Sequence, residues 1–165
     1  MIDLRYLYTN RYTTPGFKEK FESYIEQLIK ENPLSTVNEG IAQTVEQIEK
    51  SPAYGFSLTP NLKTRFELMA SAIIDWTEYY WTLVPSDKVA KNKCLAWLDY
   101  ACQMNPYNEK IPVKALNLLY RLKQKKVALK YLNDALKAQE RIGVKDEKIL
   151  NMLKSKIASV EKDKE

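Results

Sequence analysis

The 165-residue chain has no histidine and contains only four glycines and two cysteines. Without histidine, the commonest general base and the commonest metal ligand of proteins are both missing. Two cysteines are too few for a disulfide-stabilised scaffold or a four-thiolate zinc site. The scarcity of glycine argues against an all-β protein with many tight turns. We therefore expect a chain with no metal site and no cofactor.

Catalytic motifs are missing as well. The patterns of phosphate-binding loops, dinucleotide-binding turns, zinc proteases and serine hydrolases do not occur. Cys94 and Cys102 are eight residues apart, which puts them near one face of a helix. With no histidine to activate them, we interpret them as packing residues. The acidic row Glu19, Glu22 and Glu26 is interpreted as a solvated helix face. The sequence thus predicts a protein that is not an enzyme.

The sequence contains neither the pattern of a membrane span nor that of a signal peptide, and we predict the cellular location from this. No apolar run approaches the roughly 18 residues of a membrane span. Met1 is not followed by the basic and apolar regions of a signal peptide. We expect a cytoplasmic protein with no membrane partner and with reduced cysteines. Length and a hydrophobic fraction of 45% predict one domain over residues 1–165.

Helical periodicity dominates the chain, so we predict an all-α fold of antiparallel hairpins with six to seven helices. N-terminal helices are expected over residues 14–84 and further hairpins over residues 86–160. The third helix is expected to begin at Thr59-Pro60, after a loop at residues 51–56, and to run to Trp81. Ser86 is the expected cap of the next helix, and Gly143 is expected to end the helix near residues 125–141.

A repeat appears when the chain is offset by 34 residues. Two sets of small and large side chains then coincide: Cys94, Leu98 and Ala101 lie over Ala128, Leu132 and Ala135. This spacing resembles the tetratricopeptide repeat over about residues 86–160. The match is incomplete, because Glu140 and Leu116 stand where that family has Pro and a small residue. A plain helical bundle is the alternative interpretation.

The resemblance implies stacked helical hairpins whose first helices form a concave wall. Proteins with that architecture bind other proteins as adaptors, chaperones or assembly subunits, and we predict such a function here. Lys114, Asn117 and Arg121 are spaced by three and four residues, so they share one helix face and are predicted to contact the partner. The expected partner is another protein or a peptide.

Aromatic residues are concentrated in residues 76–100. Trp81, Trp97 and Tyr100 are predicted to contribute to the partner-binding surface, because Trp and Tyr are frequent interface anchors. The alternative is that these side chains only fill the core.

Positive charge is concentrated near the C-terminus. Residues 110–165 carry a net charge of +8, whereas residues 1–109 carry −3. A basic cluster surrounds one predicted turn and comprises Arg121, Lys123, Lys125, Lys126 and Lys130. Such a cluster can bind phosphate, so a nucleic-acid-binding subunit is the alternative function.

Overall fold

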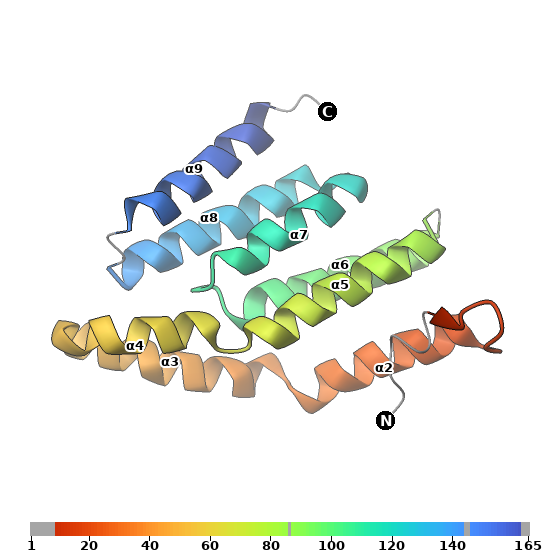
Figure 1. Ribbon diagram of the computed structural model, residues 1–165, viewed down its shortest axis with the longest axis horizontal. Coiled ribbons are helices and arrows are strands. Elements are labelled where there is room, and N and C mark those ends of the chain that lie inside the picture. The colour runs from red at the N-terminus through yellow and green to blue at the C-terminus, as the bar shows by residue number, and fades with distance from the viewer. Residues whose placement is uncertain (1–8, 86, 144–145, 163–165) are drawn as a thin grey trace.

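The computed structural model describes residues 9–85, 87–143 and 146–162. Helices joined by short connections make up this part of the chain (Figure 1). No strand occurs among the described residues, so the predicted all-α class is confirmed. In chain order the helices are α2 (Phe17–Glu31), α3 (Leu34–Lys50), α4 (Pro52–Thr64), α5 (Glu67–Leu83), α6 (Lys88–Met104), α7 (Lys110–Arg121), α8 (Lys125–Arg141) and α9 (Glu147–Lys162).

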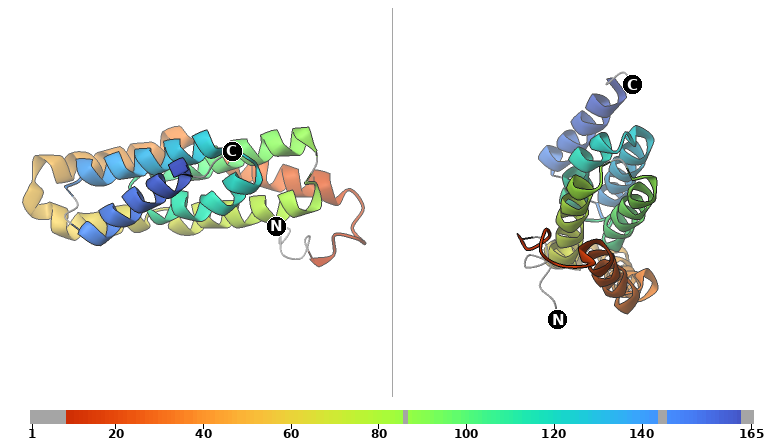
Figure 2. Two further views of the ribbon diagram at one scale, coloured as in Figure 1. Left: turned by 90° about the horizontal axis from the view of Figure 1, so that it is seen from above. Right: turned by 90° about the vertical axis from the view of Figure 1, so that its right-hand side faces the viewer.

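The hairpins α3/α4, α5/α6 and α7/α8 stack in chain order, and α9 packs on α8 (Figure 1). Adjacent hairpins are joined mainly by α5 against α7 and by α6 against α3 and α7. The two views in Figure 2 place α5, α7 and α9 in one layer and α6 and α8 in the other. None of the helices in the described residues is both long and apolar enough to cross a bilayer.

The repeat predicts two small residues at close helix contacts, and the structure agrees with that placement. Ala101 on α6 and Ala135 on α8 are both buried, with 0% and 2% of their surfaces exposed. Cys94 and Ala128, the other aligned small residues, are buried as well. Small side chains let neighbouring helices approach closely, so the predicted burial of the repeat positions is confirmed.

The predicted start of the third helix was wrong. The segment expected to be a loop belongs to α4, which begins at Pro52, and Pro60 lies inside that helix. The break falls later, at Arg65 and Phe66, where Phe66 adopts a left-handed conformation with φ 60°. Proline at the first helical position is compatible with a helix. Pro52 has this position in α4, and Pro60 does not.

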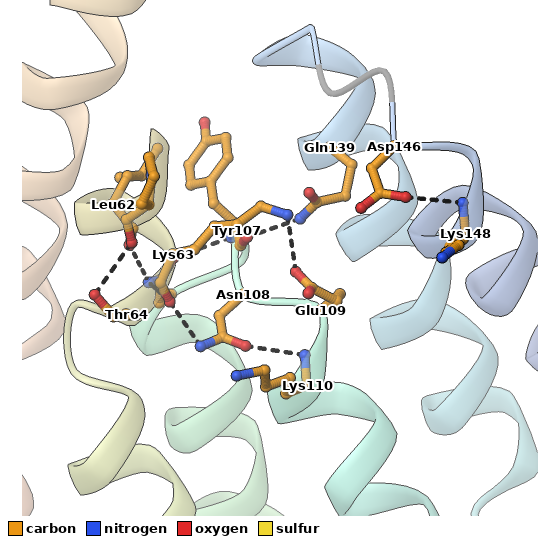
Figure 3. A network of polar contacts seen from close by, with 12 residues as sticks. Leu62, Lys63, Thr64, Tyr107, Asn108, Glu109, Lys110, Gln139, Asp146 and Lys148 are labelled. Atoms are coloured by element: carbon orange, nitrogen blue, oxygen red, sulfur yellow. Dashed lines mark hydrogen bonds and ion pairs between the residues drawn. The ribbon is translucent and has the colours of Figure 1, made fainter. Parts of the chain in front are cut away.

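The end of α4 is held by the connection between α6 and α7. Asn105 donates its side-chain amide to the carbonyls of Leu62 and Arg65, at 2.7 and 2.9 Å. Asn108 donates in the same way to the carbonyl of Lys63 at 2.6 Å, as Figure 3 shows. Helix ends leave carbonyls without intrahelical partners, so these two amides satisfy the end of α4 from 40 to 45 residues away.

The remaining predicted helix ends have mixed outcomes. Ser86 lies outside the described residues, and Asp87 caps α6 by accepting hydrogen bonds from the N–H groups of Val89 and Ala90. Gly143 follows α8 with φ 67° and donates its N–H to the Glu140 carbonyl. A left-handed glycine just after the last helical residue is a common helix ending, so the predicted role of Gly143 is confirmed.

Candidate partner-binding face and a basic pocket

A row of polar side chains follows the seam between α5 and α7. Lys114 forms an ion pair with Asp75 at 2.8 Å. One turn further along, Asn117 and Arg121 both donate to Glu78, at 3.4 and 2.8 Å. These three residues of α7 therefore share one face, as their spacing predicts. The sequence alone did not indicate that α5 supplies the matching carboxylates.

The row continues at the other end of the seam, where Lys110 pairs with Glu67 at 3.2 Å. The charged side chains of these pairs remain between 28% and 68% exposed. Exposed ion pairs contribute little to stability, typically about 0–1 kcal/mol. The row therefore connects α5 and α7 while adding little to the stability of the fold. Its polar groups remain within reach of a partner.

Three of the predicted partner-binding residues are buried in the core. Trp81, Trp97 and Tyr100 are 8%, 3% and 6% exposed. The Trp97 ring packs edge-on against Tyr80 at a centroid distance of 5.1 Å, and the Tyr100 hydroxyl donates to the Asn32 carbonyl at 2.5 Å. The prediction of direct partner contact is corrected for Trp97 and Tyr100, because they fill the space where α2, α5 and α6 meet. Trp81 is largely buried as well, but it lines a pocket beside α6 and the end of α7.

Other large side chains are exposed beside the polar row. Leu68 on α5 is 87% exposed, and Tyr79, eleven residues later on the same helix, is 40% exposed. Eleven residues complete about three helical turns, so the two share a face. Tyr120 on α7 is 38% exposed. The sequence places Tyr79 in the aromatic segment 76–100 but does not single out Leu68 or Tyr120, because apolar spacing identifies the buried stripe of a helix and not its exceptions.

The lysines of the predicted basic cluster have different neighbours. Lys130 points to the seam with α6, where it lies 3.9 Å from Asp99. Lys125 instead donates to the backbone carbonyl of Glu161 on α9, at 3.3 Å. Lys126 is exposed on α8. Arg121 and Lys123, two of the predicted five, line a common pocket.

This pocket of about 280 Å³ is lined by residues at the end of α5, the beginning of α6 and the end of α7. Its wall contains cationic side chains from two distant segments, apolar side chains and one carboxylate. The cations are Lys88, Lys91, Arg121 and Lys123, the apolar residues are Trp81, Pro85 and Leu122, and the carboxylate is Asp87. We call it the basic pocket. Sequence reasoning missed Lys88 and Lys91 because they precede the predicted cluster by 30 residues or more, and only hairpin stacking brings them together.

The two cysteines are buried, with pKa values that disfavour the reactive thiolate. Burial raises the pKa of the Cys94 thiol to about 12. Burial also raises the pKa of the Cys102 thiol, with a smaller contribution from the nearby Asp99. Thiolates are the nucleophilic form of cysteine, so neither side chain is arranged for catalysis. In the described ranges, no group of three or more acidic or cysteine side chains is placed to hold a metal ion.

The chain matches no protein-family model, and no similar protein was found among curated sequences or solved structures.

Proposed function

We propose that the protein is a protein-interaction module, acting as an adaptor, chaperone or assembly subunit, and that its partner binds the outer face of α5 and α7. The observation that carries the proposal is the polar row on this face, with Leu68 and Tyr79 beside it on α5 and Tyr120 on α7. Apolar and aromatic anchors next to polar groups are typical of protein interfaces.

The stacked hairpins support this proposal, because side-by-side helices provide an extended surface for a partner. We also propose that the 34-residue repeat is structural. In this repeat α6 corresponds to α8, and α7 corresponds to α9. In a tetratricopeptide-like stack, α5 and α7 would be first helices of successive units. Lys114, Asn117 and Arg121 would then lie on the wall that binds the partner.

Site-specific photo-crosslinking tests the proposed face. A photoreactive residue at Asn117 should capture a defined protein, whereas the same residue at the exposed Lys137 of α8 should not. Capture should survive nuclease treatment. Crosslinking that is equal at both positions, or that disappears with nuclease, would contradict the proposal, and the second result would favour the nucleic-acid alternative.

A matched pair of double variants provides the second test. Leu68→Ser with Asn117→Ala should weaken binding of the captured protein at least about tenfold. Val89→Ser with Asn92→Ala changes similar exposed residues on α6 and should leave binding unchanged. Both doubles should unfold near the parent's midpoint, because exposed substitutions usually change stability by no more than about 0.5 kcal/mol.

A further inference from the structure

The basic pocket contains lysines without anionic partners. Within residues 9–85, 87–143 and 146–162, Lys88, Lys91 and Lys123 form neither an ion pair nor a hydrogen bond through their ammonium groups. Other partly buried lysines of this protein are paired: Lys63 lies 3.1 Å from Glu109, and Lys93 lies 2.9 Å from Glu22. Lys91 differs from these lysines: it is half-buried and lines the pocket, but no carboxylate contacts its ammonium group.

The one carboxylate in the pocket wall is already engaged. Asp87 accepts a hydrogen bond from Lys18 at 2.7 Å and two more from the N–H groups of Val89 and Ala90. The hydrogen bond from Lys18 is the main reason why the pKa of Asp87 lies below its usual range. Since Lys18 compensates Asp87 and Glu78 compensates Arg121, the three remaining lysines leave the pocket with excess positive charge.

The backbone at Lys123 gives an independent indication. Lys123 adopts a left-handed conformation with φ 55°, at the end of α7, where Gly143 stands in the corresponding turn after α8. Residues with a Cβ atom are disfavoured in this conformation, and helix endings of this kind usually have glycine. Residues held in such conformations cluster at active sites and ligand-binding segments. Here the side chain of Lys123 lines the basic pocket.

We propose that the basic pocket binds a single phosphate monoester group. Lys88, Lys91 and Lys123 would neutralise its charge through charge-assisted hydrogen bonds. Trp81, Pro85 and Leu122 would contact the apolar part of the molecule that carries the phosphate. The volume of about 280 Å³ is at the lower end of ligand pockets, which suits a small phosphorylated molecule or one phosphorylated side chain of a protein.

A compact phosphate site fits the structure better than a nucleic-acid track. A nucleic-acid strand needs cations along several successive phosphates. Lys125 and Lys130, which would extend the pocket along α8, are directed to α9 and to Asp99 instead. The phosphate proposal does not depend on the proposed partner, because the pocket residues differ from Leu68 and Asn117, on which the partner test relies.

NMR titration of the intact chain tests the phosphate site. O-phospho-L-tyrosine should shift the amide signals of residues 87–91 and 121–123, whereas L-tyrosine at the same millimolar concentration should not. A phosphotyrosine peptide that binds more tightly than the free amino acid would identify a phosphorylated protein as the source, and equal affinity would identify a small phosphorylated molecule. No shift with any phosphorylated probe, or tighter binding of a short single-stranded oligonucleotide, would overturn the proposal.

Two double variants with the same net charge separate the pocket from general electrostatics. Lys88→Gln with Lys91→Gln should weaken phosphotyrosine binding at least about tenfold. Lys137→Gln with Lys154→Gln changes exposed lysines outside the pocket and should bind as the parent does. Lys123→Gly should weaken binding while raising the unfolding temperature. Equal binding by the two doubles would refute the pocket assignment.

Discussion

The side-chain amide of Asn105 lies 2.7 Å from the backbone carbonyl of Leu62 and joins the α6–α7 connection to the end of α4. The carbonyl oxygen of the same side chain accepts the N–H of Tyr107 at 3.0 Å. Asn108 repeats this arrangement, donating to Lys63 and accepting from the N–H of Lys110 at 2.9 Å (Figure 3). Each asparagine thus shapes its own turn and terminates a helix distant in sequence.

Asn105→Ala should lower the free energy of unfolding by about 2–4 kcal/mol. Asn105 is fully buried. Its loss removes the side-chain donor of the Arg65 carbonyl and the shorter of two hydrogen bonds to the Leu62 carbonyl, which also accepts the Arg65 N–H at 3.3 Å. A buried polar group left unsatisfied costs about 1–3 kcal/mol. Urea denaturation monitored by circular dichroism measures the change. Asn92→Ala, on the exposed side of α6, serves as the control and should cost no more than about 0.5 kcal/mol. Equal losses in the two variants would contradict the assigned role of Asn105.

The sequence predicted those features that depend on local pattern. Apolar spacing identified the all-α class, the 34-residue offset predicted that Ala101 and Ala135 are buried, and Gly143 marked the end of α8. Each of these follows from residues within one or two helices. The break at Phe66 could not be read in this way, because the donor that holds it, Asn105, lies about 40 residues further along the chain.

The candidate sites were less predictable for the same reason. The shared face of Lys114, Asn117 and Arg121 follows from helical spacing, and it is present. Which aromatic residues are buried depends on how α2 covers α5 and α6, so composition alone could not separate Trp97 from Tyr79. The basic pocket likewise requires two turns from different hairpins to meet, which no local pattern encodes.

Leucine substitution at the two repeat alanines should have unequal effects. Ala101 is fully buried, so Ala101→Leu should lower the free energy of unfolding by about 1–3 kcal/mol through overpacking. Ala135 borders a pocket of about 230 Å³ that Cys102 and Tyr131 also line. The larger side chain can enter this space, so Ala135→Leu should cost less than about 1 kcal/mol.

Urea denaturation of both alanine variants checks this difference. Ala96→Leu, on the exposed side of α6, provides a reference for the helix preference of leucine alone and should be nearly neutral. A larger loss at Ala135 than at Ala101 would mean that the pocket beside α8 does not accept a side chain.

Glu22 should make stability depend on pH in the acid range. Burial opposes its ionisation, but the hydrogen bond from Tyr80 and the ion pair with Lys93 outweigh burial and hold the pKa of Glu22 below its usual range. A carboxyl whose pKa is lower in the folded state binds protons more readily in the unfolded state. Its stabilising contribution is therefore present above the unfolded pKa and is lost as pH falls through the folded value.

Comparison of Glu22→Gln with the parent between about pH 7 and about pH 3 tests this dependence. The variant should be less stable at neutral pH, and the difference in free energy of unfolding should shrink on acidification. Tyr80→Phe removes one of the stabilising hydrogen bonds and should show a smaller pH-dependent difference of the same sign. Parallel pH profiles for Glu22→Gln and the parent would exclude this contribution.

Substitutions at the two left-handed residues Lys123 and Gly143 should change the free energy of unfolding in opposite directions. Lys123→Gly relieves a left-handed residue with φ 55° and should raise the free energy of unfolding by about 1 kcal/mol. Gly143→Ala introduces a Cβ atom at φ 67°, where no heavy atom lies within 4 Å, so its cost of about 1 kcal/mol should come from the backbone alone. Thermal and urea unfolding of both variants measure the two effects. If Lys123→Gly instead destabilised the protein, the Lys123 side chain would itself contribute to folding, and its strained conformation would no longer indicate a ligand site.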